Sequence, residues 1–124
     1  MTATPKISIP QPGQPVRGSK TGAPVMALLD LLGRRWALGV LWVLAENAPC
    51  TFNALQAKCT GISPGVLNTR LKELKLANLI EQGESGYALT SQGAELFNMM
   101  EPLGMWAKYT WAPTFEESEV PAKK

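Results

Sequence analysis

Apolar residues in the middle of the chain recur with the spacing of an amphipathic helix. Leu67, Leu71 and Leu74 stand at positions i, i+4 and i+7, which places them on one helical face. Ser63 is a good N-cap, and the proline that follows it suits a first helical turn. We therefore predict a helix over about residues 63–77. Its other face carries small, amide, hydroxyl and basic side chains, which can hydrogen-bond base edges and phosphates.

Apolar segments on the N-terminal side of this helix predict a helical scaffold. A first helix is expected over residues 24–33. A second, over residues 34–46, is apolar almost all round and is expected at the centre of the fold. A short third helix over residues 53–58 then leads through a glycine turn into the polar-faced helix. A short helix, a turn and a capped second helix form the helix-turn-helix pattern.

The C-terminal side of the same helix predicts a small β hairpin and a long final helix. Residues 80–82 and 87–89 alternate in polarity and are separated by a turn, as expected of two antiparallel strands. Residues 50–52 are a candidate third strand. The final helix is expected from about residue 90 to residue 111. The predicted fold class is mainly α with a small antiparallel β wing, a winged helix-turn-helix.

The final helix has more apolar surface than one core-facing stripe needs. Met100 and Leu103 belong to such a stripe, while Trp106 and Trp111 read equally well as core or as interface residues. Other apolar residues outside the stripe are Phe97, Met105 and Tyr109.

The chain of 124 residues divides into one predicted domain with two tails. Residues 1–22 are rich in proline and glycine and predict a flexible arm, residues 23–112 the winged-helix domain, and residues 113–124 a flexible tail. No apolar run approaches the length that a membrane span requires. The N-terminus lacks the pattern of a signal peptide, so a cytoplasmic protein with no membrane partner is expected.

Charge is distributed unevenly along the chain, although the formal net charge is only +2. Residues 1–80 carry nine Lys and Arg against three acidic residues, and residues 81–124 carry seven Glu against three Lys. The positive part contains the polar-faced helix, which fits a phosphate-binding surface. The alternative is that solvated charges simply fall unevenly.

The chemistry of an enzyme is missing from the sequence. There is no histidine, and the two cysteines, Cys50 and Cys59, are not spaced as a metal-binding pair. We therefore predict no catalytic residues, no metal within one chain and no cofactor. Free thiols that pack as small apolar groups are the simplest reading of both cysteines, with redox sensing as the alternative.

Four short motifs follow one another along the chain: ALLDLLG at 27–33 with Trp36, FNAL at 52–55, GIS and RLKEL within 61–74, and LT with Gly93 and Leu96. In this order they resemble the ALDLIGGKW, FNEL, GIS…L..RLKEL and LT..G..L segments of the HxlR family of bacterial winged-helix transcriptional regulators. The resemblance implies a DNA-binding homodimer whose first and last helices pack against those of a second subunit. The interface residues that it implies are Val25, Leu28, Met99, Leu103, Trp106 and Trp111.

As a DNA-binding homodimer, the protein would present two copies of the helix about one DNA turn, roughly 34 Å, apart and read an inverted repeat. Asn68 could pair with adenine, and Thr69 could reach a base or a thymine methyl group. The residues predicted at the major groove are Ser63, Gly65, Asn68, Thr69 and Lys72.

Other residues are predicted to contact phosphates. Arg70 and Lys75 are candidates on the same helix, although Arg70 could equally form an intramolecular ion pair. Thr51 and Asn53, at the start of the preceding helix, could offer backbone N–H groups.

Three departures from the family pattern affect the prediction. Family members commonly carry a cysteine before the proline that opens the first helix, and here that residue is Ala23. The wing carries Glu81 and Glu84 and no basic residue, so it should contact phosphates poorly. Gly65 stands where a basic or polar residue is common.

Two alternatives to a sequence-specific DNA-binding regulator stay open. A winged-helix protein-interaction module with weak or lost DNA binding would explain the acidic wing. A pocket lined by the tryptophans and methionines could also hold an apolar small-molecule effector.

Overall fold

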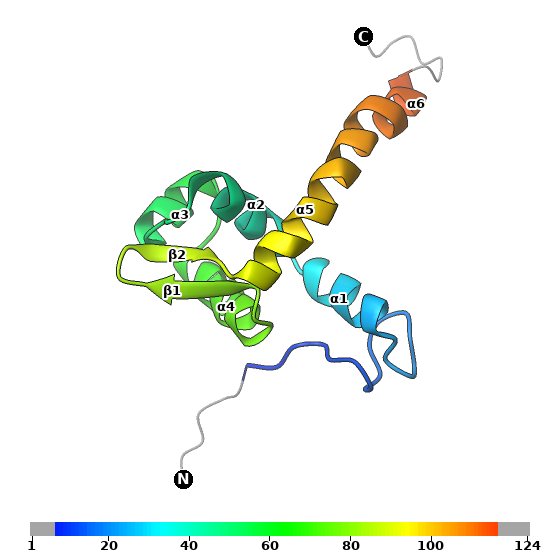
Figure 1. Ribbon diagram of the computed structural model, residues 1–124, viewed down its shortest axis with the longest axis horizontal. Coiled ribbons are helices and arrows are strands. Elements are labelled where there is room, and N and C mark those ends of the chain that lie inside the picture. The colour runs from blue at the N-terminus through cyan, green and yellow to red at the C-terminus, as the bar shows by residue number, and fades with distance from the viewer. Residues whose placement is uncertain (1–6, 117–124) are drawn as a thin grey trace.

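The computed structural model describes residues 7–116 and shows the predicted winged helix-turn-helix (Figure 1). Its long elements are helical and its sheet is a two-stranded antiparallel hairpin, which confirms the predicted fold class. The elements in chain order are α1 (Pro24–Leu32), α2 (Ala37–Asn47), α3 (Phe52–Lys58), α4 (Pro64–Leu76), β1 (Ile80–Gly83), β2 (Gly86–Leu89), α5 (Ser91–Trp106), the π-helical turn η1 (Ala107–Trp111) and α6 (Ala112–Glu116).

Helix α2 lies at the centre of the fold, as its apolar sequence predicts. Val40, Leu41 and Leu44 are buried, and α2 contacts α1, α3, α5 and β2. Its predicted start at residue 34 is wrong, because α2 begins three residues later. Trp36 has a left-handed backbone, with φ of 76°, so residues 34–36 form a turn instead of a helical extension.

The wing is a hairpin with a two-residue loop. Ile80 pairs with Leu89, and Gly83 pairs with Gly86 at the end of the ladder. The candidate third strand contributes a single bridge in the part of the chain that the structure describes. In this bridge the Cys50 and Tyr87 backbones exchange hydrogen bonds of 3.0 and 2.7 Å.

The last helix projects away from the body formed by the other elements (Figure 1). It begins where the Thr90 hydroxyl accepts a hydrogen bond from the Gly93 N–H at 2.9 Å. Beyond η1 the helical backbone continues through Glu116, five residues further than predicted. Helix α6 therefore includes the start of the predicted tail, and residues 117–124 of that tail lie outside the described residues.

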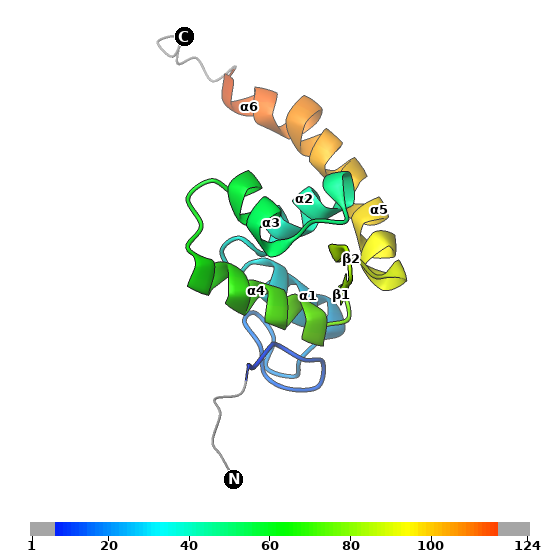
Figure 2. The same cartoon turned by 90° about the vertical axis from the view of Figure 1, so that its left-hand side faces the viewer.

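The N-terminal segment lies against α1 and the end of α4 (Figure 2). Ile9 packs against the core, and the Ser8 carbonyl accepts a hydrogen bond from the Arg34 guanidinium at 3.2 Å. A small turn follows, in which Val16 and Ser19 form an isolated bridge. The flexibility predicted for the arm stays a prediction, and its residues 1–6 lie outside the described residues. Within residues 7–116, no helix is long and apolar enough to cross a membrane.

Candidate nucleic-acid interface

Helix α4 buries one face and leaves the other free, as its pattern predicts. Leu67, Leu71 and Leu74 are each at most 1% exposed. The Ser63 hydroxyl accepts a hydrogen bond from the Val66 N–H at 3.1 Å, which caps the helix and fixes where it begins. The hydroxyl predicted to meet a base is therefore already used as an acceptor within the chain.

The free face of α4 carries the predicted base-contacting side chains. Gly65, Asn68 and Lys72 are exposed, and Thr69 is half-buried. Between residues 7 and 116, no hydrogen-bond or ionic partner engages the Asn68, Thr69 or Lys72 side chain. A Cβ at Gly65 would meet no atom within 4 Å, so the backbone is also open to an approaching surface there. These residues share the solvent-facing side of α4, which is polar and basic.

Arg70 belongs instead to an ion-pair network that fixes α4 to the body. Its Nη1 lies 3.2 Å from Oε1 of Glu73, and its Nε donates to the Arg35 carbonyl at 2.7 Å. Arg34 Nη1 lies 2.6 Å from the other carboxylate oxygen. Of the two roles left open for Arg70, the structure shows the intramolecular ion pair, so a phosphate contact would have to compete with these bonds.

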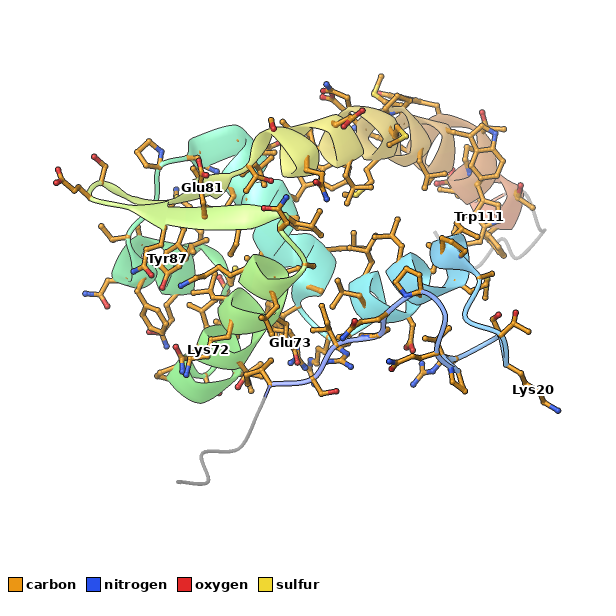
Figure 3. All side chains as sticks on the ribbon, turned by 60° about the horizontal axis from the view of Figure 1, so that its bottom comes forward. Lys20, Lys72, Glu73, Glu81, Tyr87 and Trp111 are labelled. Carbon is orange, nitrogen blue, oxygen red and sulfur yellow. The ribbon has the colours of Figure 1, made fainter. Side chains whose placement is uncertain are left out.

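Glu73, at the centre of that network, is a residue that sequence reasoning missed. It is 5% exposed, and Figure 3 shows it on a different side of α4 from Lys72. The one available signal was its position between the apolar Leu71 and Leu74. A carboxylate in such a position requires a cationic partner, but the sequence does not say which one.

The other residues predicted to contact phosphates differ in their exposure and in the hydrogen bonds that they already make. Lys75 is exposed and its Nζ donates to the Gln82 side chain on β1 at 3.2 Å. The Thr51 hydroxyl caps α3 by accepting from the Ala54 N–H at 3.1 Å, and Asn53 is exposed in the first turn of that helix. Phosphate contacts by these residues stay predictions.

The wing presents negative charge to solvent. Glu81 and Glu84 are exposed, and Glu84 stands in the two-residue loop at the tip (Figure 3 labels Glu81). The hairpin therefore has the acidic surface that its sequence predicts.

The residues predicted at a subunit interface form an apolar surface on α1 and on the last helix. Val25, Met99, Leu103, Trp106 and Trp111 are more than half exposed, while Leu28 is half-buried. A cavity of about 350 Å³ between α1, α2 and α5 continues this surface, with Leu29, Leu38 and Leu103 in its wall. Leu29, on the apolar face of the first helix, was not among the predicted interface residues.

Two aromatic residues differ from expectation. The sequence groups Phe97 with the surplus apolar surface, but Phe97 is half-buried and stacks edge-on against Trp42, with ring centroids 4.9 Å apart. Phe115, which the sequence assigns to the tail, lies on α6 and stacks edge-on against Trp111 at 5.1 Å. The apolar surface therefore extends further along the last helix than the sequence indicates.

Both cysteines are buried and free. Burial raises the pKa of the Cys59 thiol, with a smaller contribution from Cys50. A raised pKa lowers the thiolate fraction of Cys59 at neutral pH, which favours an inert, packing role over the sensing role for this residue.

A capped helix with a free polar face, preceded by a short helix and followed by a hairpin, defines the class of helix-turn-helix DNA-binding proteins. Residues 31–115 match the HxlR-like helix-turn-helix family, and the chain belongs to this family. The predicted family is confirmed.

Relatives and solved structures give the same assignment. The chain is 29% identical over 85 residues to "Uncharacterized HTH-type transcriptional regulator BH0655" of Halalkalibacterium halodurans, covering 63% of this chain and 75% of the relative. It is 28% identical over 99 residues to "Uncharacterized HTH-type transcriptional regulator MJ0925" of Methanocaldococcus jannaschii, covering 77% and 89%.

Among solved structures, quinone-bound YodB from B. subtilis is similar with a TM-score of 0.63 and 30% identity, covering 68% of this chain and 94% of that one. A possible HxlR family transcriptional factor from Thermoplasma volcanium GSS1 has a TM-score of 0.61 and 29% identity, covering 68% and 82%. The chain is thus a helix-turn-helix transcriptional regulator of the HxlR family, and its relatives are regulators, not enzymes.

Proposed function

We propose that this regulator acts as a homodimer that inserts α4 into the major groove of an inverted-repeat operator. The observation that carries the proposal is the face of α4 that bears Asn68 and Lys72. It is exposed, polar and basic, and its side chains have no partner between residues 7 and 116, while the opposite face is locked into the core.

Each residue of this face has a distinct role in the proposed complex. The Asn68 amide can donate to N7 of adenine through its nitrogen and accept from the N6 amino group through its oxygen, a pairing that favours adenine. Thr69 can contact a thymine methyl group, and Gly65 allows the helix backbone to approach the groove closely. Lys72 and Lys75 supply positive charge to phosphates.

The homodimer is supported by the apolar residues left exposed on α1, α5 and α6. Met99 and Leu103 are 65% and 62% exposed on a helix that projects from the body (Figure 1). Contiguous exposed apolar surface of this kind marks a protein-interaction site. A two-fold pairing through it would present two copies of α4, about one DNA turn apart.

The acidic wing supports a second candidate, a protein-interaction module with weak DNA binding. Glu81 and Glu84 are exposed at the hairpin that would otherwise contact phosphates. Salt separates the two functions, because phosphate binding weakens steeply with ionic strength and apolar association does not.

A response to a small-molecule effector in the cytoplasm is also part of the proposal. One solved relative, YodB, is known in a quinone-bound form. Since Ala23 replaces the cysteine expected before the first helix, we expect any effector of this chain to bind non-covalently.

The test is fluorescence anisotropy of the protein with its own upstream intergenic DNA and with a scrambled duplex, over a salt series. We expect tighter binding to the native duplex and a steep salt slope. Asn68→Ala should lower the affinity for the native duplex about tenfold and relax sequence specificity. Lys72→Ala should weaken binding to both duplexes and flatten the salt dependence of log K by about 0.9 for each phosphate that this lysine neutralises.

Lys20→Ala is the matched control, because Figure 3 shows Lys20 far from α4 and this variant removes the same charge. Lys20→Ala should leave the affinity for both duplexes unchanged. Absence of binding to either duplex even at low salt would contradict the DNA proposal and favour the protein-interaction module.

A further inference from the structure

The turn between α1 and α2 lies beside α4, the proposed recognition helix, and is bonded to it. Arg70 Nε on α4 donates to the Arg35 carbonyl at 2.7 Å. The preceding residue, Arg34, pairs with Glu73 of α4 at 2.6 Å, and Glu73 also pairs with Arg70 at 3.2 Å. The backbone at Arg35 is therefore held against α4 by its own carbonyl and by the residue before it.

The Arg35 side chain is exposed and carries a charge that the described residues do not neutralise. Arg34 and Arg70 share the carboxylate of Glu73. Arg35, in contrast, has no carboxylate within ion-pair distance among residues 7–116. The turn and the adjacent side of α4 thus bring three arginines together with one glutamate, which leaves an excess of positive charge there.

Trp36 gives the Arg35 guanidinium a preferred position. The guanidinium carbon lies 5.7 Å from the centroid of the Trp36 ring, within the range of a cation–π contact. Trp36 is half-buried against the core, and a Cβ at Gly61, in the turn before α4, would lie 4.0 Å from its ring. Arg35 is thus a positioned cation beside the N-terminal half of α4, the part of a recognition helix that contacts base edges.

Arg35 and the wing lie on different sides of α4. Lys75 Nζ donates to the Gln82 side chain on β1 at 3.2 Å, which marks the side of α4 that faces the wing. Arg70, which marks the side that faces Arg35, stands five positions earlier. At 3.6 residues per turn, five positions correspond to about 140° around the helix axis. The exposed face that bears Asn68 therefore has the acidic wing on one side and Arg35 on the other.

We propose that Arg35 binds a phosphate of the operator, on the DNA strand opposite to the one that the wing faces. The inference rests on the proposed function, in which α4 lies in the major groove. A helix lying along that groove has one sugar-phosphate backbone on each side, and the two backbones belong to opposite DNA strands. Arg35 then supplies phosphate binding on one side of the groove, while the wing, with Glu81 and Glu84, supplies little on the other.

An exposed arginine suits this ligand. A guanidinium can form two parallel hydrogen bonds to phosphate oxygens, and the Trp36 contact restricts the positions that it must give up on binding. Arg35 exchanges water for phosphate, and the release of counterions from the DNA favours that exchange. The contact carries no sequence information, because every base pair presents the same phosphates.

The first test is the fluorescence anisotropy salt series with Arg35→Gln, which removes the charge but keeps a long side chain over Trp36. Its affinity for the native and the scrambled duplex should fall by the same factor, about fivefold, and the salt dependence of log K should flatten by about 0.9. Arg35→Lys keeps the charge and should keep the salt dependence. An unchanged midpoint of thermal unfolding in both variants shows that the fold is intact.

Arg17→Gln is the matched control. Arg17 is also an exposed arginine, with its side chain 86% exposed, but it pairs with Asp30 of α1. Arg17→Gln should leave the affinity and the salt dependence unchanged. If Arg35→Gln behaves as Arg17→Gln does, the contact is overturned.

Phosphate ethylation interference then locates the contact. We expect one phosphate in each half-site whose ethylation hinders the unaltered protein but not Arg35→Gln. Lys75→Gln should remove interference at a phosphate of the other DNA strand in the same half-site. A pattern that Arg35→Gln leaves unchanged overturns the contact, and a change on the strand that Lys75→Gln also affects overturns its placement opposite the wing.

Failure of this inference is distinguishable from failure of the proposed function. If the unaltered protein binds neither duplex even at low salt, the proposed function and the Arg35 contact fall together. If it binds with a steep salt dependence that Lys72→Ala flattens and Arg35→Gln does not, only the Arg35 contact falls.

Discussion

Helices α4 and α5 are both amphipathic, but they differ in how much of the apolar face is buried within the chain. Leu67, Leu71 and Leu74 of α4 are at most 1% exposed, whereas Met99 and Leu103 of α5 are more than 60% exposed. The exposed residues that α4 presents around Asn68 and Lys72 are polar and basic, whereas those that α5 presents around Met99 and Leu103 include large apolar side chains. The first surface suits a nucleic-acid backbone and bases, and the second suits another protein surface.

The two helices also differ in how they are attached. Helix α4 is fixed along its length by its core leucines and by Glu73, which lies between two arginines. Helix α5 is anchored at its start, where Gly93 packs against the Leu79 backbone, and further along by Phe97 against Trp42 and by buried Met100, while Met99 and Leu103 stay exposed. A recognition helix must hold its orientation, and an interface helix completes its packing only when a partner arrives.

The largest expected effect comes from releasing α4. Glu73→Gln leaves two guanidinium groups around a neutral amide, and we expect the free energy of unfolding to fall by about 3 kcal/mol. Glu84→Gln, an exposed glutamate on the wing, should change it by less than about 0.5 kcal/mol. Urea denaturation followed by circular dichroism measures both, and equal small effects would show that the network does not stabilise α4.

The next effect concerns the apolar face of α5. Leu103→Glu places a charge in the proposed interface and should weaken self-association by at least about 100-fold, as measured by sedimentation equilibrium. Monomer stability should hardly change, since Leu103 is already exposed. Asn98→Glu adds the same charge at an exposed polar position of α5 and should leave self-association intact. Equal behaviour of the two variants would remove this surface from the interface.

A smaller effect is expected from making the wing basic. Glu84→Lys should bring the hairpin tip to phosphates, raise DNA affinity several-fold and steepen the salt slope by about 0.9 for each additional phosphate neutralised. Glu95→Lys, exposed on α5, makes the same charge change away from the wing. If both variants raise affinity equally, net charge and not the position of the wing is the cause.

The smallest effect concerns helix α2, against which α5 packs. Gly39 lies exposed within α2, and a Cβ there would meet no atom within 4 Å. Gly39→Ala should therefore stabilise the fold by about 0.7 kcal/mol through helix propensity. Gly93→Ala should destabilise it, because the added methyl group would overlap the Leu79 carbonyl. Thermal unfolding distinguishes the two, and a loss of stability in Gly39→Ala would indicate that another surface packs closely on this position.

Features of the fold that depend on local signals were predictable from the sequence. The start of α4 follows from Ser63 and Pro64, and its buried face follows from the spacing of three leucines. The wing follows from alternation around a turn. Each signal lies within a few residues of the structure that it specifies.

Features set by distant contacts could not be predicted. Trp36 begins α2 late because its backbone is left-handed, which no local pattern requires. Glu73 pairs with Arg34 across 39 positions of the chain, and the sequence does not indicate that partner. The last helix passes Pro113 because the wider turn η1 directly precedes it, whereas the proline alone suggests an end.

Hydroxyl-radical footprinting on a duplex selected from a random pool is the sharpest single test of the proposed complex, because it reports the recognition helix and the dimer together. We expect two protected patches about one DNA turn apart, related by a two-fold axis. Leu103→Glu should protect neither patch at a concentration at which the unaltered protein protects both. A single patch unaffected by Leu103→Glu, or no sequence-dependent protection at all, would contradict the proposed dimeric recognition.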